Sequence, residues 1–217
     1  MADYYFKSKD KVKQRFSGKA KDSTYLYIDG TNLFAGQNEL VGPRMYLSFR
    51  FLLTEIKKFI KIDKVYFYAS YMSKHGKLDA YHKQLIVSEA LFYREVKKTS
   101  SVTFYKGHRS ITSGKEKGVD VHLAVDILKD VVLGNCNNVV IMTGDADLIY
   151  PIEIVKTFGI SSCAVFLPNR FSLELAYKAE KAFVLNLLNK FKVNRKLPRQ
   201  LKVISIKKPR MINIRGK

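Results

Sequence analysis

Aspartates follow two apolar stretches of the sequence, at the points where buried strands would end. Asp29 comes directly after YLYI in YLYIDGTN, and Asp145 and Asp147 lie in TGDADL, which follows the apolar run NVVIM. A further aspartate, Asp120, opens the segment KGVDVHLAVD, in which apolar residues recur at helical spacing. A carboxylate at the edge of a core costs free energy unless a helix N-terminus, a proton or a cation compensates it. These aspartates are therefore the first candidates for chemistry.

Carboxylates gathered in one place repel one another, so either some of them bind protons or a cation neutralises them. These aspartates supply only hard oxygen ligands, which suit Mg²⁺ or Mn²⁺ rather than zinc. Such ions orient a phosphodiester and activate a water for attack on phosphorus. The alternative is that each aspartate is a helix cap or turn former, and this alternative is stronger for Asp147 than for Asp29. We predict a metal site formed by Asp29, Asp120 and Asp145, with Asp147 joining directly or through water.

Two further polar side chains accompany these aspartates, and we expect both to orient substrate or water. Asn32 either closes the turn after Asp29 or holds the attacking water or a phosphate, because an amide both donates and accepts hydrogen bonds. Thr143 opens the TGDADL segment. Asp126 lies about 240° round a helix from Asp120, so we expect it to support the site or to lie on the surface.

Strand-like runs alternate with helical patterns along the chain. Short apolar runs predict strands that are covered on both faces, at 25–28, 64–69, 102–106, 138–142 and 162–166. Apolar residues at spacings of three and four predict helices over 44–60, 79–96, 119–133, 148–158 and 171–189. The alternation predicts an α/β three-layer sandwich with a central, mostly parallel five-stranded sheet and right-handed crossovers.

The expected sheet would position the aspartates. Ligands of a doubly wound parallel sheet bind at the carboxyl ends of the strands, where the strand order reverses. If strands 25–28 and 138–142 are neighbours at that point, Asp29 and Asp145 converge. Asp120, at the start of a helix, could then point into the same crevice.

The charge of the chain is strongly positive and unevenly distributed. The net charge is +20, and residues 191–217 carry ten basic and no acidic side chains. Residues 1–24 carry seven basic and three acidic side chains. We expect a basic flexible N-terminal arm over 1–24, an α/β domain over 25–190 and a basic C-terminal tail over 191–217. Within that tail, LKVISI is either an extra strand or part of an ordered tail. Such a field attracts polyanions such as nucleic acid or acidic lipid, although basic tails can also merely aid solubility.

The segment 107–118, GHRSITSGKEKG, reads as an exposed basic loop just before Asp120. Lys106, Lys115 and Lys117, at its edge and within it, are candidates for contacts with substrate phosphates. No apolar run is long enough to span a membrane, and the N-terminus lacks the apolar stretch of a signal peptide. The two cysteines lack metal or redox spacing and are expected to be free thiols. We therefore expect a cytoplasmic protein.

Three motifs, taken in order, resemble those of a known family. IDGTN at 28–32, KGVDVHLAVD at 117–126 and TGDADL at 143–148 resemble the motifs of the NYN domain, and within it those of the LabA-like group of the PIN-like nuclease superfamily. The resemblance covers residues 25–180. It implies a PIN-like α/β fold and an acidic, metal-bound pocket. The implied activity is that of an Mg²⁺- or Mn²⁺-dependent ribonuclease, usually an endonuclease.

The resemblance also assigns positions within the motifs. The family's metal-site aspartates and its strand-end amide fall on Asp29, Asn32, Asp120, Asp145 and Asp147. Where the family usually has an aromatic residue after the last aspartate, this chain has Leu148, and its next proline is Pro151. Neither departure removes an expected metal ligand, although the start of the local helix can differ.

Our leading hypothesis is a divalent-metal-dependent ribonuclease whose basic tails bind the RNA backbone. The alternative is a non-catalytic RNA- or DNA-binding protein that keeps the nuclease fold. A third hypothesis is a phosphohydrolase of small phosphoesters, against which the extended positive charge counts. The RNA target, the number of metal ions and a possible homodimer stay open.

Overall fold

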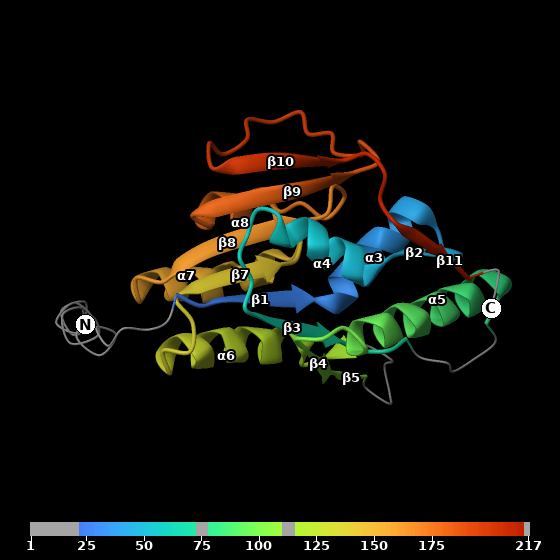
Figure 1. Cartoon of the computed structure of the whole chain (residues 1–217), viewed down its shortest axis with the longest axis horizontal. Helices are drawn as coiled ribbons and strands as arrows, with labels where there is room; N and C mark the ends of the chain where they lie inside the picture. The colour runs from blue at the N-terminus through green and yellow to red at the C-terminus, as the bar shows by residue number, and fades with distance from the viewer. Residues whose placement is uncertain (1–21, 73–77, 110–115, 215–217) are drawn as a thin grey trace.

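The computed structural model describes residues 22–72, 78–109 and 116–214. Its centre is a single parallel sheet of seven strands, in the order β10-β9-β8-β7-β1-β3-β4 (Figure 1). The strands are β1 (Thr24–Asp29), β3 (Lys64–Ala69), β4 (Val102–Lys106), β7 (Asn138–Met142), β8 (Ser161–Phe166), β9 (Lys181–Leu187) and β10 (Leu201–Ile206). Two small antiparallel pairs accompany the sheet, β2 (Met45–Leu47) with β11 (Met211–Asn213) and β5 (His108–Arg109) with β6 (Glu116–Lys117).

Helices cover both faces of the sheet, so the domain has three layers. One face packs against α3 (Gly30–Val41), α4 (Phe49–Lys57) and α5 (Ala80–Lys97). The other face packs against α6 (Val119–Val132), α7 (Ile149–Thr157) and α8 (Leu173–Lys178), and a short 3-10 turn, η1 (Ala146–Leu148), precedes α7. Because side chains alternate along a strand, Leu26 and Ile28 of β1 lie in the first core and Tyr27 lies in the second. No helix of the described part of the chain is long and apolar enough to cross a membrane.

The α/β class and all five expected strands are confirmed, but the strand count of five is wrong. The sixth strand, β9, lies in the range 171–189 that we expected to be one helix, of which only α8 is helical. Both faces of β9 are covered, and its sequence, KAFVLNL, is mostly apolar. An apolar run of this length does not distinguish a strand from a segment of buried helix. The seventh strand, β10, is the LKVISI segment, which pairs with β9 at the edge of the sheet.

Three of the expected helices correspond closely to α5, α6 and α7. The helix expected over 44–60 begins later, at Phe49, because residues 45–47 form β2. Helix α3 was not expected, since its sequence GTNLFAGQNELV contains two glycines and a weak apolar stripe. Gly30 is nevertheless required there, because a Cβ atom would lie 2.1 Å from the ring of Phe67.

The strand order reverses beside β1. The chain leaves β1 for β3 and β4 on one side, then returns to β7 on the other side and continues to β8, β9 and β10. Strands β1 and β7 are neighbours, with Ile28 opposite Met142. The residues that follow these two positions, Asp29 and Thr143, therefore leave the sheet side by side at its carboxyl edge, as the sequence analysis required.

Candidate active site

A cavity of about 280 Å³ opens at this reversal of strand order. Three of the expected aspartates line it: Asp29 from the end of β1, Asp120 from the first turn of α6, and Asp145 from the loop after β7. The remaining lining residues are Thr31, Asn32, Ala35, Gly118, Val119 and Arg170. The fold therefore brings together aspartates that lie far apart in the sequence.

Asp29 is both a helix cap and a wall of the cavity. It is 4% exposed, and its Oδ1 atom accepts a hydrogen bond of 2.9 Å from the backbone N–H of Asn32 at the start of α3. Its Oδ2 atom accepts a hydrogen bond of 3.0 Å from the hydroxyl of Thr143. A carboxylate has about four lone-pair sites, so capping a helix and facing a ligand are compatible. The two interpretations of Asp29 are therefore not exclusive.

Asn32 and Thr143 tie the start of α3 to the loop after β7. The Oδ1 atom of Asn32 accepts a hydrogen bond of 3.0 Å from the backbone N–H of Gly144. The Oγ1 atom of Thr143 accepts one of 3.0 Å from the N–H of Asp145, while its hydroxyl donates to Asp29. Both side chains thus hold the loop in place, and Asn32 also lines the cavity. Direct contact with substrate stays a prediction for both.

The structure separates the two aspartates of TGDADL. Asp145 lines the cavity, and its Oδ1 atom accepts a hydrogen bond of 2.9 Å from the backbone N–H of Asp147. The side chain of Asp147 is exposed, and Asp147 is outside the set of described residues that line the cavity. Any contact between Asp147 and a metal ion stays a prediction.

Helix α6 presents Asp120 to the cavity and holds Asp126 elsewhere. Gly118 precedes the helix with a φ of 82°, a conformation that favours glycine, and Asp120 lies in the first turn, where the helix dipole favours a negative charge. Asp126 accepts a hydrogen bond of 2.9 Å from the hydroxyl of the buried Tyr68, which raises the pKa of that tyrosine together with burial, the larger cause. Asp126 therefore helps to fix α6 on the sheet.

The expected basic contacts are outside the set of described residues that line the cavity. Lys106 is the last residue of the edge strand β4, which β3 separates from β1. The ammonium of Lys106 lies 5.6 Å from the centre of the Tyr71 ring. Lys117 belongs to β6, directly before the cavity residue Gly118. Lys115 lies outside the described residues. Contacts between these lysines and phosphates stay predictions.

A cation that lines the cavity is Arg170, which the sequence analysis missed. It follows β8, and its guanidinium forms an ion pair with Glu39 of α3. Its Nε atom is buried and has no hydrogen-bond partner within the described part of the chain. Two glycines make room for Arg170. A Cβ atom on Gly144 would lie 2.6 Å from the carbonyl oxygen of Arg170, and a Cβ atom on Gly36 would lie 2.6 Å from its Cγ atom.

The donor chemistry of the cavity fits Mg²⁺ or Mn²⁺, since carboxylate oxygens are the ligands that these hard ions prefer. Among the residues that the structure describes, however, no group of three or more His, Cys, Asp or Glu is spaced to hold a metal ion. Mg²⁺ usually keeps several waters and binds only one or two carboxylates directly. The cavity therefore fits a hydrated ion better than an ion enclosed by protein ligands.

The domain is a doubly wound α/β sheet with acidic side chains at its reversal point. The sequence model of the NYN domain matches residues 23–186, and the chain therefore belongs to the NYN family of the PIN-like superfamily, which confirms the resemblance. NYN domains are typically nucleases, and nucleases of this superfamily generally use divalent metals.

A solved structure with the same fold is the crystal structure of a protein of unknown function from Vibrio parahaemolyticus, with a TM-score of 0.56 and 14% sequence identity. The match covers 77% of this chain and 95% of the other, and at this identity it shows the fold alone. No curated protein matches the chain.

Proposed function

We propose that this protein is a divalent-metal-dependent ribonuclease that cleaves RNA at the acidic cavity. The observation that carries the proposal is the convergence of Asp29, Asp120 and Asp145 on one cavity at the carboxyl edge of the sheet. The net charge of +20 supports a polyanionic substrate rather than a small phosphoester, because a small substrate needs no extended positive surface.

The residues of the chain have distinct roles in this proposal. Asp29, Asp120 and Asp145 would hold Mg²⁺ or Mn²⁺, in part through water. When bound, such an ion would polarise the phosphodiester and lower the pKa of its bound water, which makes that water a better nucleophile at neutral pH. Asp29 is fixed by two hydrogen bonds on a rigid strand end, which keeps its carboxylate in place without a cost of reorganisation.

Arg170 supplies a positive charge to the same cavity. A guanidinium binds phosphate oxygens through a planar set of donors, and the ion pair with Glu39 uses only part of the five N–H donors of Arg170. We propose that Arg170 contacts the scissile phosphate and stabilises the charge that develops on it. The ion pair with Glu39 would hold the guanidinium in position.

A cleavage assay with matched aspartate variants tests the proposal. Purified protein is incubated with end-labelled single-stranded RNA and Mn²⁺ or Mg²⁺, with EDTA as the metal-free control. The informative variant is Asp120→Asn, and its control is Asp126→Asn, which changes a carboxylate on the same helix that contacts Tyr68 instead of the cavity. We expect metal-dependent cleavage that Asp120→Asn abolishes and Asp126→Asn retains. Cleavage at the wild-type rate in Asp120→Asn would show that the cavity is not the active site.

A second candidate function is non-catalytic binding of nucleic acid. The spacing of the acidic residues favours it, since they do not form a ready metal cluster in the described part of the chain. RNA that binds equally well in EDTA, and that stays intact with Mn²⁺, would support this function against the first.

A further inference from the structure

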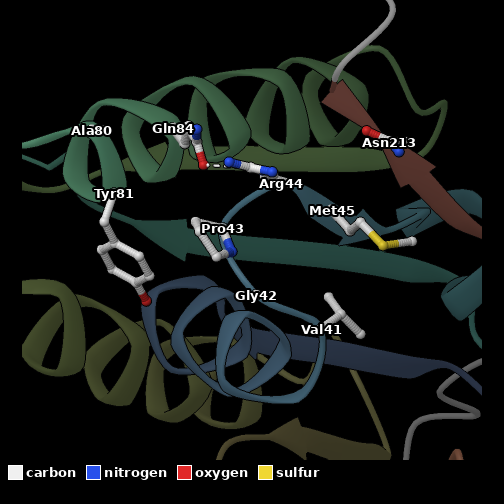
Figure 2. Close-up of a pocket in the computed structure, with 9 residues that line it drawn as sticks. All are labelled: Val41, Gly42, Pro43, Arg44, Met45, Ala80, Tyr81, Gln84 and Asn213. Atoms are coloured by element: carbon white, nitrogen blue, oxygen red, sulfur yellow. Dashed lines mark hydrogen bonds between the residues drawn. The ribbon is translucent and has the colours of Figure 1, made fainter.

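A second and larger cavity, of about 610 Å³, lies at the far end of α3 (Figure 2). It is lined by Val41, Gly42, Pro43, Arg44, Met45, Ala80, Tyr81, Gln84 and Asn213. Helix α3 begins at the acidic cavity with Gly30 and ends at this second cavity with Val41. Its 12 residues span about 18 Å at the usual helical rise, so the two cavities are separated by a few nucleotides of an extended strand.

The second cavity presents an aromatic ring in a fixed position. Tyr81, in the first turn of α5, is 47% exposed. Its hydroxyl oxygen accepts a hydrogen bond of 3.1 Å from the side-chain amide of Asn38 on α3, and Figure 2 shows the ring pointing from α5 toward α3. The ring is thus held at both ends while much of its surface stays open to a ligand.

The same cavity presents an oriented guanidinium. The Nε atom of Arg44 donates a hydrogen bond of 3.0 Å to the Oε1 atom of Gln84 (Figure 2). Arg44 is exposed, and the backbone N–H of Ile214 donates a hydrogen bond of 3.0 Å to its carbonyl oxygen. The hydrogen bond to Gln84 uses only one of the five N–H donors of an arginine, so the outer nitrogens can bind an anion.

The charge of the chain favours an anionic partner. Strand β11 places Asn213, a residue of the cavity, opposite Met45, and the chain as a whole has a net charge of +20. An exposed aromatic ring and a guanidinium that line the same cavity of a strongly basic chain are the groups with which proteins bind single-stranded nucleic acid without reading its sequence.

We infer that this cavity is a second subsite for single-stranded RNA, in which a base stacks on Tyr81 and a phosphate contacts Arg44. The subsite would hold the strand a few nucleotides away from the bond at the acidic cavity. The inference rests on the proposed function for its substrate, but binding at this subsite requires neither a metal ion nor cleavage.

The test measures RNA affinity without metal and cleavage with it. Fluorescence anisotropy with a labelled oligoribonucleotide of about 12 nucleotides, in EDTA, gives the affinity, since sites of this kind cover about 4–16 nucleotides. We expect Tyr81→Ala to weaken binding by roughly 5- to 150-fold, the usual loss for one stacked base. Tyr81→Phe should retain the affinity, because the ring remains, and Arg44→Ala should weaken it independently of Tyr81.

Two controls isolate the subsite. Tyr177→Ala removes a tyrosine on α8 that is 50% exposed and should leave the affinity unchanged. Cleavage of an oligoribonucleotide of about 3 nucleotides with Mn²⁺ should be the same in Tyr81→Ala as in the wild type, because so short a strand does not reach the second cavity.

The outcomes separate this inference from the proposed function. Wild-type affinity in both Tyr81→Ala and Arg44→Ala would overturn the inference, as would a wild-type protein that binds no RNA. Loss of affinity in these variants, in a protein that leaves RNA intact with Mn²⁺, would support the subsite and refute the nuclease activity. A circular dichroism spectrum of each variant shows whether it is folded before its affinity is interpreted.

Discussion

Two substitutions of Asp29 separate its structural role from its proposed chemical one. Asp29→Asn keeps an oxygen that accepts from the N–H of Asn32, and asparagine caps helices as well as aspartate does. The new amide can donate to Thr143 Oγ1 once the threonine hydroxyl turns away. We expect the free energy of unfolding to fall by about 1 kcal/mol or less, the net value of one neutral hydrogen bond.

Asp29→Ala should destabilise the protein more. It removes the cap of α3, which costs about 1 kcal/mol. It also removes the acceptor of the Thr143 hydroxyl. Thr143 is 3% exposed, and a buried polar group without a partner costs about 1–3 kcal/mol. The free energy of unfolding should therefore fall by about 2–4 kcal/mol.

Cleavage should respond differently from stability. Neither asparagine nor alanine carries the negative charge that a divalent cation requires, so both variants should lose metal-dependent cleavage completely. Urea unfolding followed by circular dichroism gives the two stabilities, and the RNA assay with Mn²⁺ gives the two activities. The reasoning is refuted if the asparagine variant is as unstable as the alanine variant, or if either variant cleaves RNA at the wild-type rate.

Two further predictions concern Arg170 and the buried tyrosines. Arg170→Ala should lower kcat/KM by about 10- to 100-fold, the value of a charged hydrogen bond, and Arg170→Lys should retain only part of the wild-type value. The control Lys178→Ala breaks a comparable surface ion pair with Glu153 and should leave kcat/KM unchanged. Equal loss in Arg170→Ala and Lys178→Ala would refute the role of Arg170. Burial raises the pKa values of Tyr27 and Tyr68 above the usual value near 10. Above that pH the folded state therefore keeps protons that the unfolded state loses. The free energy of unfolding should keep its full contribution from these tyrosines below about pH 10 and should fall as the pH rises further. The part of the tyrosinate absorbance that comes from the buried tyrosines should then appear only together with the loss of circular dichroism, and reversible titration of every tyrosine in the native fold would contradict this.

The sequence predicted the part of the fold that depends on local pattern. Strand β1 and the motif TGDADL could be placed because an apolar run that ends on an aspartate is a local signal. The cavity could be anticipated because the reversal of strand order follows from the topology of doubly wound sheets. The three aspartates at the cavity were found in this way.

The missed features depend on packing between distant segments. Strand β9 resembles a buried helix in its sequence, and its pairing with β8 and β10 decides its conformation. Helix α3 follows from the cap by Asp29 and from the contact of Gly30 with Phe67. The position of Arg170 depends on Gly36 and Gly144, which lie far from it in the chain, and the sequence alone contains no motif that joins these residues.

If the acidic cavity is the active site, the distribution of charge predicts that metal and substrate bind it together. The cavity holds three aspartates and one arginine, and that arginine is already paired with Glu39, so a phosphate that enters without a cation meets a net negative charge. The outer surface is positive, with a net charge of +20 over the chain, and it attracts the same phosphate strand. A short RNA that reaches only the acidic cavity should therefore need Mg²⁺ or Mn²⁺ to bind, whereas a longer RNA that also reaches Tyr81 and Arg44 should bind in EDTA.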